Sequence, residues 1–331
     1  MATATLDVVG IGNAIVDVLV QADEAFLVTH GLAKGTMTLI DAARADALYA
    51  VMGPGIEESG GSAGNTMAGI ASLGGDGAYI GKVRNDQLGE VFRHDITAIG
   101  VRFATAPARS GPPTARCLIL VTPDAHRTMN TFLGACVDLG PEDIDDEIIA
   151  AAQITYLEGY LFDPPRAKEA FRKAAQLAHS AGRRVSLSLS DPFCVGRHRA
   201  EFRELVQHHV DILFANEAEI CSLYETDDFD EAARQVRRYC DVAALTRSEK
   251  GSVVVTQDHT HMIEAAKVAR VVDTTGAGDL YASGFLYGLT HGSDLATCGR
   301  LGSLCAAEAI SHFGARPAQP LAALARQAGL L

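Results

Sequence analysis

The chain has 331 residues, 48% of them hydrophobic, and a formal net charge of −13. This length suits one large α/β domain or two moderate ones, and the apolar content is ample for a core. The negative charge argues against a nucleic-acid partner and against an anionic membrane surface, whereas a phosphate ligand needs only a few local donors.

The N-terminal segment and the cysteines indicate the compartment. The first residues show no basic stretch followed by an apolar run, and no stretch approaches the roughly 18 apolar residues of a membrane span. The seven cysteines are scattered without a Cys-x-x-Cys pair. This spacing fits thiols in a reducing compartment and not a disulfide or zinc framework. We therefore expect a cytoplasmic protein with no membrane partner.

Strand-like apolar runs recur along the first three quarters of the chain. They lie at residues 8–11, 78–80, 154–157, 185–189, 212–215, 243–246 and 252–256. Helical stretches rich in Ala, Glu and Arg separate several of them, for example at 165–180 and 229–240, and the chain is mainly helical from residue 280 on. Strand–helix alternation predicts the α/β class, as a doubly wound, mostly parallel sheet with helices on both faces.

Two segments interrupt this alternation with short β-like pieces and turn residues. The pieces lie at 16–20, 36–39, 116–121 and 128–132. Together they predict a small second sheet that covers a ligand at the carboxyl ends of the main strands. The expected division is a large domain at 1–14, 46–100 and 136–331 and a discontinuous small β lid at 15–45 and 101–135.

The turn after the first strand reads Gly-Ile-Gly-Asn-Ala-Ile at residues 10–15. It lacks the third glycine of a dinucleotide fingerprint, and a strand-like segment follows it, so an NAD oxidoreductase is a weak alternative. Asn13 and Asp17 are polar residues at the start of the expected lid, where an amide and a carboxylate can bind vicinal hydroxyls. A turn asparagine and a solvated strand aspartate explain the same two residues.

Polar turns follow apolar or helical segments at three further places. The glycine-rich turn at 60–65 ends in Asn65 and can approach a ligand closely, although a serine-capped turn explains it equally. Asn216 and Glu219 share a helix face and suit Mg²⁺, or alternatively form a helix cap. The turn at 246–251 can hold phosphates or a ribose, and by itself is only a hairpin.

Residues 273–279 read Asp-Thr-Thr-Gly-Ala-Gly-Asp, before a segment of small residues. The glycines let consecutive N–H groups point at one spot, and a helix starting there directs its positive dipole end to the same spot. A carboxylate beside such an anion hole is unfavourable unless Asp279 takes a proton from a hydroxyl that attacks the bound phosphoryl group. An ordinary helix start, with Asp279 stabilising the dipole, is the alternative.

In this order, the five motifs resemble those of the ribokinase-like (PfkB-type) carbohydrate and nucleoside kinases, over almost the whole chain. The matching residues are Gly12, Asn13, Asp17, Gly60, Gly61, Asn65, Asn216, Glu219, Thr246, Gly251 and the heptapeptide 273–279. Segments 156–160, 189–193 and 210–219, together with Asp124 and Arg127, are most similar to the adenosine kinase branch. The resemblance implies a ribokinase-like fold and ATP-dependent phosphoryl transfer to an alcohol.

Carried over to the matching positions, the resemblance implies a role for each site residue. The catalytic group comprises Asp279 as general base, Gly276, Ala277 and Gly278 as the anion hole, and Arg127 reaching the phosphate from the lid. The ribose lies against Asn13, Asp17, Gly61, Ser62 and Asn65, and the nucleobase against Ile15, Met129, Thr131, Tyr160 and Phe193. ATP lies against Asn216, Glu219, Thr246, Gly251 and Gly278, with Mg²⁺ held by Glu219 through water and a monovalent cation such as K⁺ near Asp273 and Thr275.

The implied substrate is adenosine, phosphorylated on its 5′-hydroxyl to AMP, a purine salvage reaction. Thr275 replaces the asparagine usual in eukaryotic adenosine kinases, the base-pocket positions are less aromatic than a purine stack favours, and Arg116 could instead meet a phosphorylated sugar. The alternatives are a sugar kinase of the same fold acting on ribose, fructose or a related sugar, and a nucleoside- or nucleotide-binding protein without turnover. Since some lids of this family pair, the chain is expected to be a monomer or a homodimer.

Overall fold

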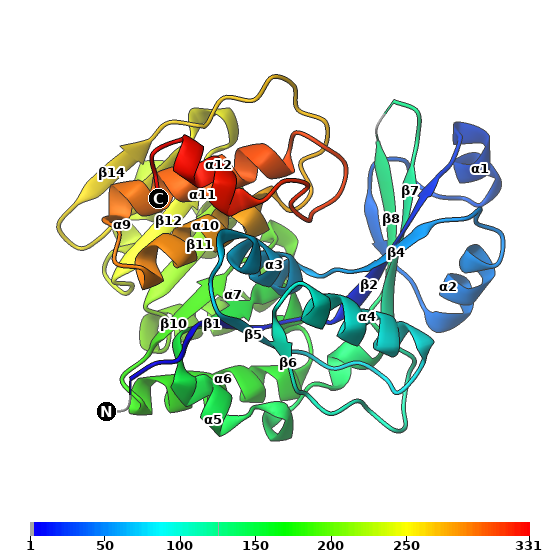
Figure 1. The fold of residues 1–331 in the computed structure, drawn as a ribbon, viewed down its shortest axis with the longest axis horizontal. Helices are drawn as coiled ribbons and strands as arrows, with labels where there is room; N and C mark the ends of the chain where they lie inside the picture. Colours follow the sequence, from blue (N-terminus) through cyan, green and yellow to red (C-terminus); the bar gives the residue numbers. More distant parts are fainter. Residues whose placement is uncertain (1–2, 125) are drawn as a thin grey trace.

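The structure is a computed structural model that describes residues 3–124 and 126–331. The strands within these residues form a nine-stranded and a five-stranded sheet. In Figure 1 the five-stranded sheet stands to the right of the larger part. The predicted α/β class, with a mostly parallel sheet and a second small sheet, is confirmed.

The large sheet has the strand order β14-β13-β12-β11-β10-β9-β1-β5-β6. All neighbours from β12 to β6 are parallel, whereas β13 and β14 are antiparallel additions at one edge. The carboxyl ends of the parallel strands therefore meet at one edge of the sheet. The strands are β1 (Leu6–Ile11), β5 (Gly77–Ile80), β6 (Arg102–Phe103), β9 (Ala152–Glu158), β10 (Arg184–Ser188), β11 (Ile212–Asn216), β12 (Val242–Thr246), β13 (Ser252–Val255) and β14 (Thr260–Ile263).

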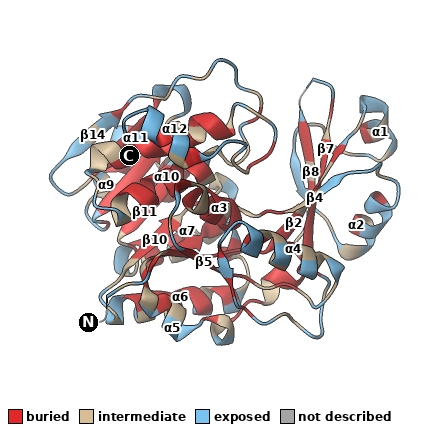
Figure 2. Ribbon diagram, viewed as in Figure 1, coloured by how far each residue is buried: buried red, intermediate tan, exposed pale blue. Residues whose placement is uncertain are grey.

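Helices cover both faces of this sheet, because its strands are apolar on both sides. Val9 of β1 joins one core cluster and its neighbour Val8 joins the other, as the alternation along a strand requires. One face carries α5 (Asp146–Ala151), α6 (Pro165–Ser180), α7 (Pro192–His208), α8 (Glu217–Tyr224) and α9 (Phe229–Val236). The other carries α3 (Ser62–Leu73), α4 (Gln87–Ala98), α10 (Ala277–Thr290) and α11 (Leu295–Ala309), with α12 (Leu321–Gln327) packed on α3 and α11. Figure 2 shows the buried residues gathered in these layers.

Short 3₁₀ helices punctuate the connections: η1 (Gly134–Asp138), η2 (Pro141–Asp143), η3 (Gly159–Phe162) and η4 (Ser248–Lys250). Among the described residues, none of the helices is long and apolar enough to cross a membrane.

The small sheet has the order β3-β8-β7-β2-β4, formed by β2 (Ile15–Gln21), β3 (Met37–Leu39), β4 (Ile56–Ser59), β7 (Ala115–Val121) and β8 (Arg127–Phe132). The helices α1 (Glu24–Thr29) and α2 (Ala42–Tyr49) pack Leu27 and Leu48 into the same core cluster as the β2 valines. Two strands belong to a different sheet from the one that the expected boundaries of the large domain and the lid imply. The edge strand β4 carries two glutamates and shows no apolar alternation, yet it pairs with β2, and β6 extends the large sheet instead of the small one.

The chain crosses between the two sheets beside the first strand. It leaves β1 and enters β2 through residues 12–14, and it returns from β4 into α3 through residues 60–61. Gly61 precedes α3 with φ +82°, and a Cβ there would lie 2.2 Å from the carbonyl oxygen of Asn13. Only glycine allows the two crossings to approach this closely. The crossings therefore bring Asn13 and the start of α3 together.

Candidate active site

The heptapeptide forms the turn that enters α10. Gly276 has φ +76°, and a Cβ there would lie 2.7 Å from the Cβ of Ala315, so this turn requires glycine. The N–H of Ala277 donates to the carbonyl oxygen of Thr274 at 3.3 Å, whereas no backbone hydrogen bond is made by the N–H of Gly278 within the described residues. Apart from its chain neighbours and the backbone of its own helix, no atom of the described residues lies within 4 Å of the position of a Cβ on Gly278. The turn thus presents free backbone donors and the positive end of a 14-residue helix to an anion.

The carboxylate of Asp279 is turned toward α3. The Ser62 hydroxyl donates to Oδ1 at 2.6 Å, and Nδ2 of Asn65 donates to Oδ2 at 3.0 Å. Since no side chain caps α10 itself, this geometry differs from an ordinary helix start. Burial raises the pKa of Asp279, while the bonds from Ser62 and Asn65 and the charge of Arg316 lower it. A carboxylate beside an anion-binding turn can take a proton from an acceptor hydroxyl.

Glu158, at the end of β9, holds the two chain crossings together. It is 1% exposed and accepts hydrogen bonds from Nδ2 of Asn13 at 2.7 Å, from the N–H of Asn13 at 3.3 Å and from the N–H of Ala63 at 2.7 Å. Burial raises its pKa to about 7 against these bonds. The sequence interpretation did not single out Glu158, although a carboxylate at the end of a buried strand was a visible signal.

Asp17 lies on β2, between Glu58 of β4 and Cys117 of β7. Its carboxylate occupies the space that a side chain on Gly60 would fill, because a Cβ there would lie 2.3 Å from Oδ2. Burial and the charge of Glu58 raise the pKa of Asp17 to about 7, and Arg316 and Arg127 oppose this shift. Asp17 is thus a half-buried carboxylate, and the charge of Asp279 also reaches it.

An ion pair joins the small sheet to the heptapeptide. Nε of Arg127 lies 3.0 Å from Oδ2 of Asp273, and both side chains are 6% exposed. Asp273 also accepts from the N–H groups of Thr275 and Gly314. Nη2 of Arg127 is buried without a hydrogen-bond partner. The guanidinium therefore lies beside the anion-binding turn and keeps an unused donor.

The residues predicted to contact the base divide between the two parts of the fold. Thr131 pairs with Cys117 in the sheet and donates a hydrogen bond to its Sγ at 3.2 Å, in the same cross-strand row as Asp17. Ile15 and Met129 belong to the apolar cluster on this face. Leu39, which sequence reasoning missed, pairs with Thr131 and is exposed. This row extends from Asp17 to the exposed edge strand β3.

The two aromatic residues predicted for the base pocket lie on the large domain. Tyr160 is on η3, after β9, and its N–H donates to Oγ of Ser190 at 3.3 Å. Phe193 is in the first turn of α7, after β10, and is 78% exposed. Among the described residues, no hydrogen bond joins either of them to Met129 or Thr131.

Arg116 lies on the other face of the small sheet from Cys117, as neighbours on a strand do. Its guanidinium pairs with Asp46 and lies over the ring of Tyr49, both on α2. The structure thus engages Arg116 with α2, on the face of the small sheet opposite Cys117, and the suggestion that it meets a phosphorylated sugar stays an untested prediction.

The residues predicted to bind ATP lie at the carboxyl ends of β11 and β12. Asn216 and Glu219 form a reciprocal cap of α8, in which both carboxylate oxygens of Glu219 accept from Asn216. Burial, together with the charges of Asp191 and Asp279, raises the pKa of Glu219 to about 7. Thr246 pairs with Asn216, and Gly251 has φ +81° beside the backbone of β14. Gly251 is thus required by the packing of β14.

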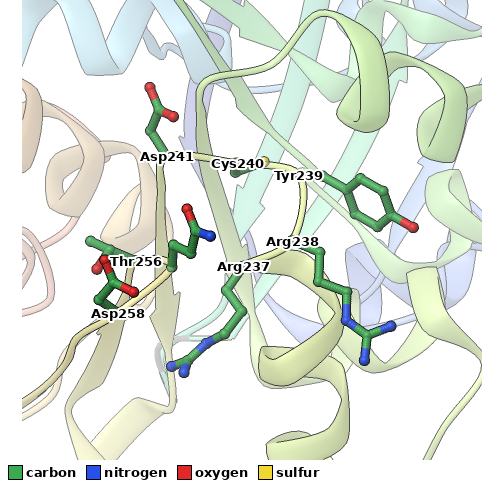
Figure 3. A pocket seen from close by; sticks show the side chains of 8 residues that line it. Arg237, Arg238, Tyr239, Cys240, Asp241, Thr256 and Asp258 are labelled. Carbon is green, nitrogen blue, oxygen red and sulfur yellow. The ribbon is translucent and has the colours of Figure 1, made fainter.

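A surface depression lies at the opposite edge of the sheet, where β12 begins and β13 ends. It is lined by residues such as Arg238, Tyr239, Asp241 and Asp258. Figure 3 shows these side chains extending in different directions instead of converging. The described residues also include no group of three or more His, Cys, Asp or Glu side chains suited to a metal ion.

The site can be compared with known proteins. Residues 55–322 match the pfkB family carbohydrate kinases. The chain belongs to this family. As a pfkB kinase it is a phosphotransferase with an alcohol group as acceptor, which is the reaction class that the motifs predicted.

Solved structures extend this comparison over the whole chain. A probable sugar kinase from Rhizobium etli CFN 42 is 52% identical, with a TM-score of 0.93, covering 99% of this chain and 100% of that one. The adenosine kinase from Sinorhizobium meliloti is 56% identical, with a TM-score of 0.91, covering 98% and 100%. The adenosine kinase of Saccharomyces cerevisiae is 27% identical over 94% of this chain and 96% of its own length. The predicted ribokinase-like fold and the similarity to adenosine kinases are confirmed.

Proposed function

We propose that this pfkB kinase transfers the γ-phosphoryl group of ATP to the 5′-hydroxyl of a ribonucleoside, and that adenosine is its substrate, giving AMP and ADP. The observation that carries the proposal is the pair of hydrogen bonds holding Asp279 beside the turn at Gly276. Phosphoryl transfer to a hydroxyl needs a base for the hydroxyl proton and, next to it, a site that binds the phosphoryl group. The similarity to two adenosine kinases supports the choice of nucleoside.

In this proposal the reacting groups meet at the start of α10. Asp279 takes the proton of the 5′-hydroxyl as its oxygen attacks phosphorus. The backbone donors of Gly276, Ala277 and Gly278 stabilise the equatorial oxygens of the transferred group. Arg127, whose Nη2 has no partner, adds a positive charge from the lid.

The ribose is proposed to lie between the two chain crossings. Asp17 accepts the vicinal hydroxyls, and Asn13, fixed by Glu158, presents its amide beside them. Asn65 and Ser62 border the same space from α3, and Gly61 leaves its backbone open to the sugar. The base is proposed to reach the inner face of the lid at Ile15, Met129 and Thr131, with Tyr160 and Phe193 closing over it from the large domain. Closure excludes water, which competes as phosphoryl acceptor.

ATP is proposed to lie against Asn216, Glu219, Thr246 and Gly251 with its phosphates toward Gly278. Both oxygens of Glu219 already accept from Asn216, which fits a hold on Mg²⁺ through water and not a direct bond. When bound, Mg²⁺ neutralises charge that develops on the phosphates.

A monovalent cation such as K⁺ beside Asp273 and Thr275 is also proposed from the resemblance. Asp273 already faces the guanidinium of Arg127, so a cation there has to share the carboxylate. The two-part division of the chain, a cytoplasmic location and a monomeric or homodimeric state are proposed on the same basis. The pairing of β4 with β2 moves residues 56–59 into the proposed lid.

A sugar kinase of the same fold is the second candidate, favoured by the 52% identity with the probable sugar kinase from Rhizobium etli. A coupled ADP-release assay over adenosine, inosine, ribose, fructose and sugar phosphates separates the two. The proposal expects kcat/KM for adenosine to exceed that for every free sugar by at least about 100-fold, since a buried base adds a few kcal/mol of binding. Preference for a sugar would overturn the nucleoside assignment, and no ADP release with any acceptor would favour a binding protein without turnover.

A further inference from the structure

Arg316 is a charged residue at the candidate site that none of the sequence motifs includes. It lies in the loop between α11 and α12, far along the chain from the lid. Its Nη2 donates to the carbonyl oxygen of Ser59 at 2.6 Å and to the Ser59 hydroxyl at 3.0 Å. Ser59 is the last residue of β4, just before the chain returns to α3. Arg316 therefore ties the end of a lid strand to the large domain.

The same strand end is held from a second side. The N–H of Ser59 donates to Oδ2 of Asp95 on α4 at 2.9 Å. The N–H, carbonyl and hydroxyl groups of Ser59 are thus engaged by Asp95 and Arg316, and in the sheet Ser59 lies opposite Val16 of β2. This fixes Asp17 and Glu58, the next cross-strand pair, relative to α3.

The guanidinium of Arg316 donates its hydrogen bonds to neutral oxygens of Ser59, although negatively charged side chains surround it. Within the described residues it makes no ion pair with a carboxylate, and its Nε is buried without a hydrogen-bond partner. Nη2 lies 3.6 Å from the position of a Cβ on Gly64, in the first turn of α3. The charges of Glu58, Asp17 and Asp95 act on the guanidinium without an ion pair to any one of them.

The ionisable groups that act on Asp17 come from every element packed around it. They are Glu58 on β4, Cys117 on β7, Arg127 on β8, Asp279 on α10 and Arg316 on the C-terminal loop. Burial raises the pKa of the Cys117 thiol to about 12, so it stays uncharged near neutral pH. Arg127 is already paired with Asp273, which leaves Arg316 as the unpaired positive charge of the group. Arg316 is also the charge that lowers the pKa of Asp279.

We propose that Arg316 is a positioning residue of the acceptor site, which holds the end of β4 against the start of α3 and places a positive charge beside the carboxylates of Asp17 and Asp279 that accept substrate hydroxyls. A carboxylate accepts hydrogen bonds at both oxygens only when it is ionised. This inference rests on the proposed function, since it takes the acceptor to lie between Asp17 and Asp279.

The sign of the effect follows from the charge. Because Arg316 lowers the pKa of Asp17, its removal shifts that pKa upward from about 7, and more of the carboxyl is protonated at neutral pH. Acceptor binding should then weaken at neutral pH and recover as the pH rises. If Arg316 had only a structural role, its removal would weaken acceptor binding by the same factor at every pH.

The test measures KM for adenosine and for ATP between pH 5.5 and about 9 in Arg316→Gln, Arg316→Lys and the wild type. Arg316→Gln should raise KM for adenosine about 5-fold at pH 7, as a shift of one pKa unit upward from about 7 implies, with a much smaller change at pH 9 and little change in KM for ATP. Arg316→Lys, which keeps the charge, should restore the pH profile. Arg93→Gln is the matched control, because Arg93 also donates to carbonyls, those of Phe103 and Thr105.

A second variant keeps the proposal testable if Arg316→Gln does not fold. Glu58→Gln removes the negative charge opposite Asp17 and should shift the acid limb of the adenosine profile to lower pH. A pH-independent loss in Arg316→Gln, or an unshifted profile in both variants of an active enzyme, would overturn the inference alone. Absence of ADP release by the wild type with every acceptor would instead overturn the proposed function.

Discussion

Asn65 on α3 donates a hydrogen bond of 3.0 Å to Asp279 on α10, although 214 residues separate them in the chain. This contact links the glycine-rich turn at the start of α3 with the anion-binding turn at the start of α10. Two elements that each resemble an ordinary helix start thereby become one site.

Asn65→Ala should slow turnover and shift its pH dependence. The hydrogen bond from Asn65 lowers the pKa of Asp279, so its loss raises that pKa and moves the acid limb of kcat/KM to higher pH. Steady-state rates across pH check this. Gln153→Ala is the control, because Gln153 also donates an amide N–H to an aspartate, Asp7, away from the site. An acid limb at the wild-type position would remove Asn65 from any control over Asp279.

Asp17→Ala should raise KM for the hydroxyl substrate by roughly 10- to 100-fold, since hydrogen bonds to a charged group contribute about 1.5–3 kcal/mol. KM for ATP should change little, because Asp17 lies on the lid strand β2. Glu57→Gln, on the neighbouring strand β4, is the control. Equal effects on both substrates would exclude Asp17 from the acceptor subsite.

Arg127→Ala should destabilise the protein by about 3–5 kcal/mol, because Asp273 is then left buried without its cation. Adding Asp273→Asn should recover part of this loss, which denaturant unfolding of the single and double variants measures. Arg166→Ala, which breaks an exposed ion pair with Glu142, should change stability little. Simple additivity of the two site substitutions would mean that the pair does not form.

Glu158→Gln should change how stability depends on pH. The folded-state pKa of Glu158 is raised to about 7 from a model-peptide value of 4.5, so its contribution is fully present below pH 4.5 and is lost as the pH rises through 7. The stability of the wild type relative to Glu158→Gln should therefore fall by an amount on the order of 1–3 kcal/mol between pH 5 and about 8. Glu204→Gln, at a half-exposed position, is the control. A constant difference across this range would show that Glu158 does not titrate there.

Sequence patterns predicted those helices and strands whose own residues clearly favour a helix or a strand. The helix Pro165–Ser180 has the expected bounds, because an amphipathic run of helix formers follows its proline. The strands β4 and β14 were missed, since Ile56–Ser59 and Thr260–Ile263 are short, incompletely buried edge segments without a clear apolar pattern. Their pairing partners, and not their composition, make them strands.

The candidate site divides in the same way. The turn at Gly276 was predictable, because its glycines and carboxylate are adjacent in the chain. The partners of Glu158 and Arg316 were not, although Glu158 stands visibly at the end of a buried strand, because Asn13 and Ser59 lie more than a hundred positions away from them in the chain. The function of such residues depends on tertiary packing, which local sequence patterns do not record.

The most direct measurement is ATP-dependent conversion of adenosine to AMP by the wild type and by Asp279→Asn, with ATP binding followed in parallel by calorimetry. The account predicts adenosine-dependent ADP release by the wild type, and a turnover lower by on the order of 10²–10⁴-fold or more in the variant, because the general base is lost. ATP binding and the folded state should persist, since asparagine keeps the size of the side chain. A variant that binds ATP and turns over adenosine at nearly the wild-type rate would contradict the assignment of Asp279.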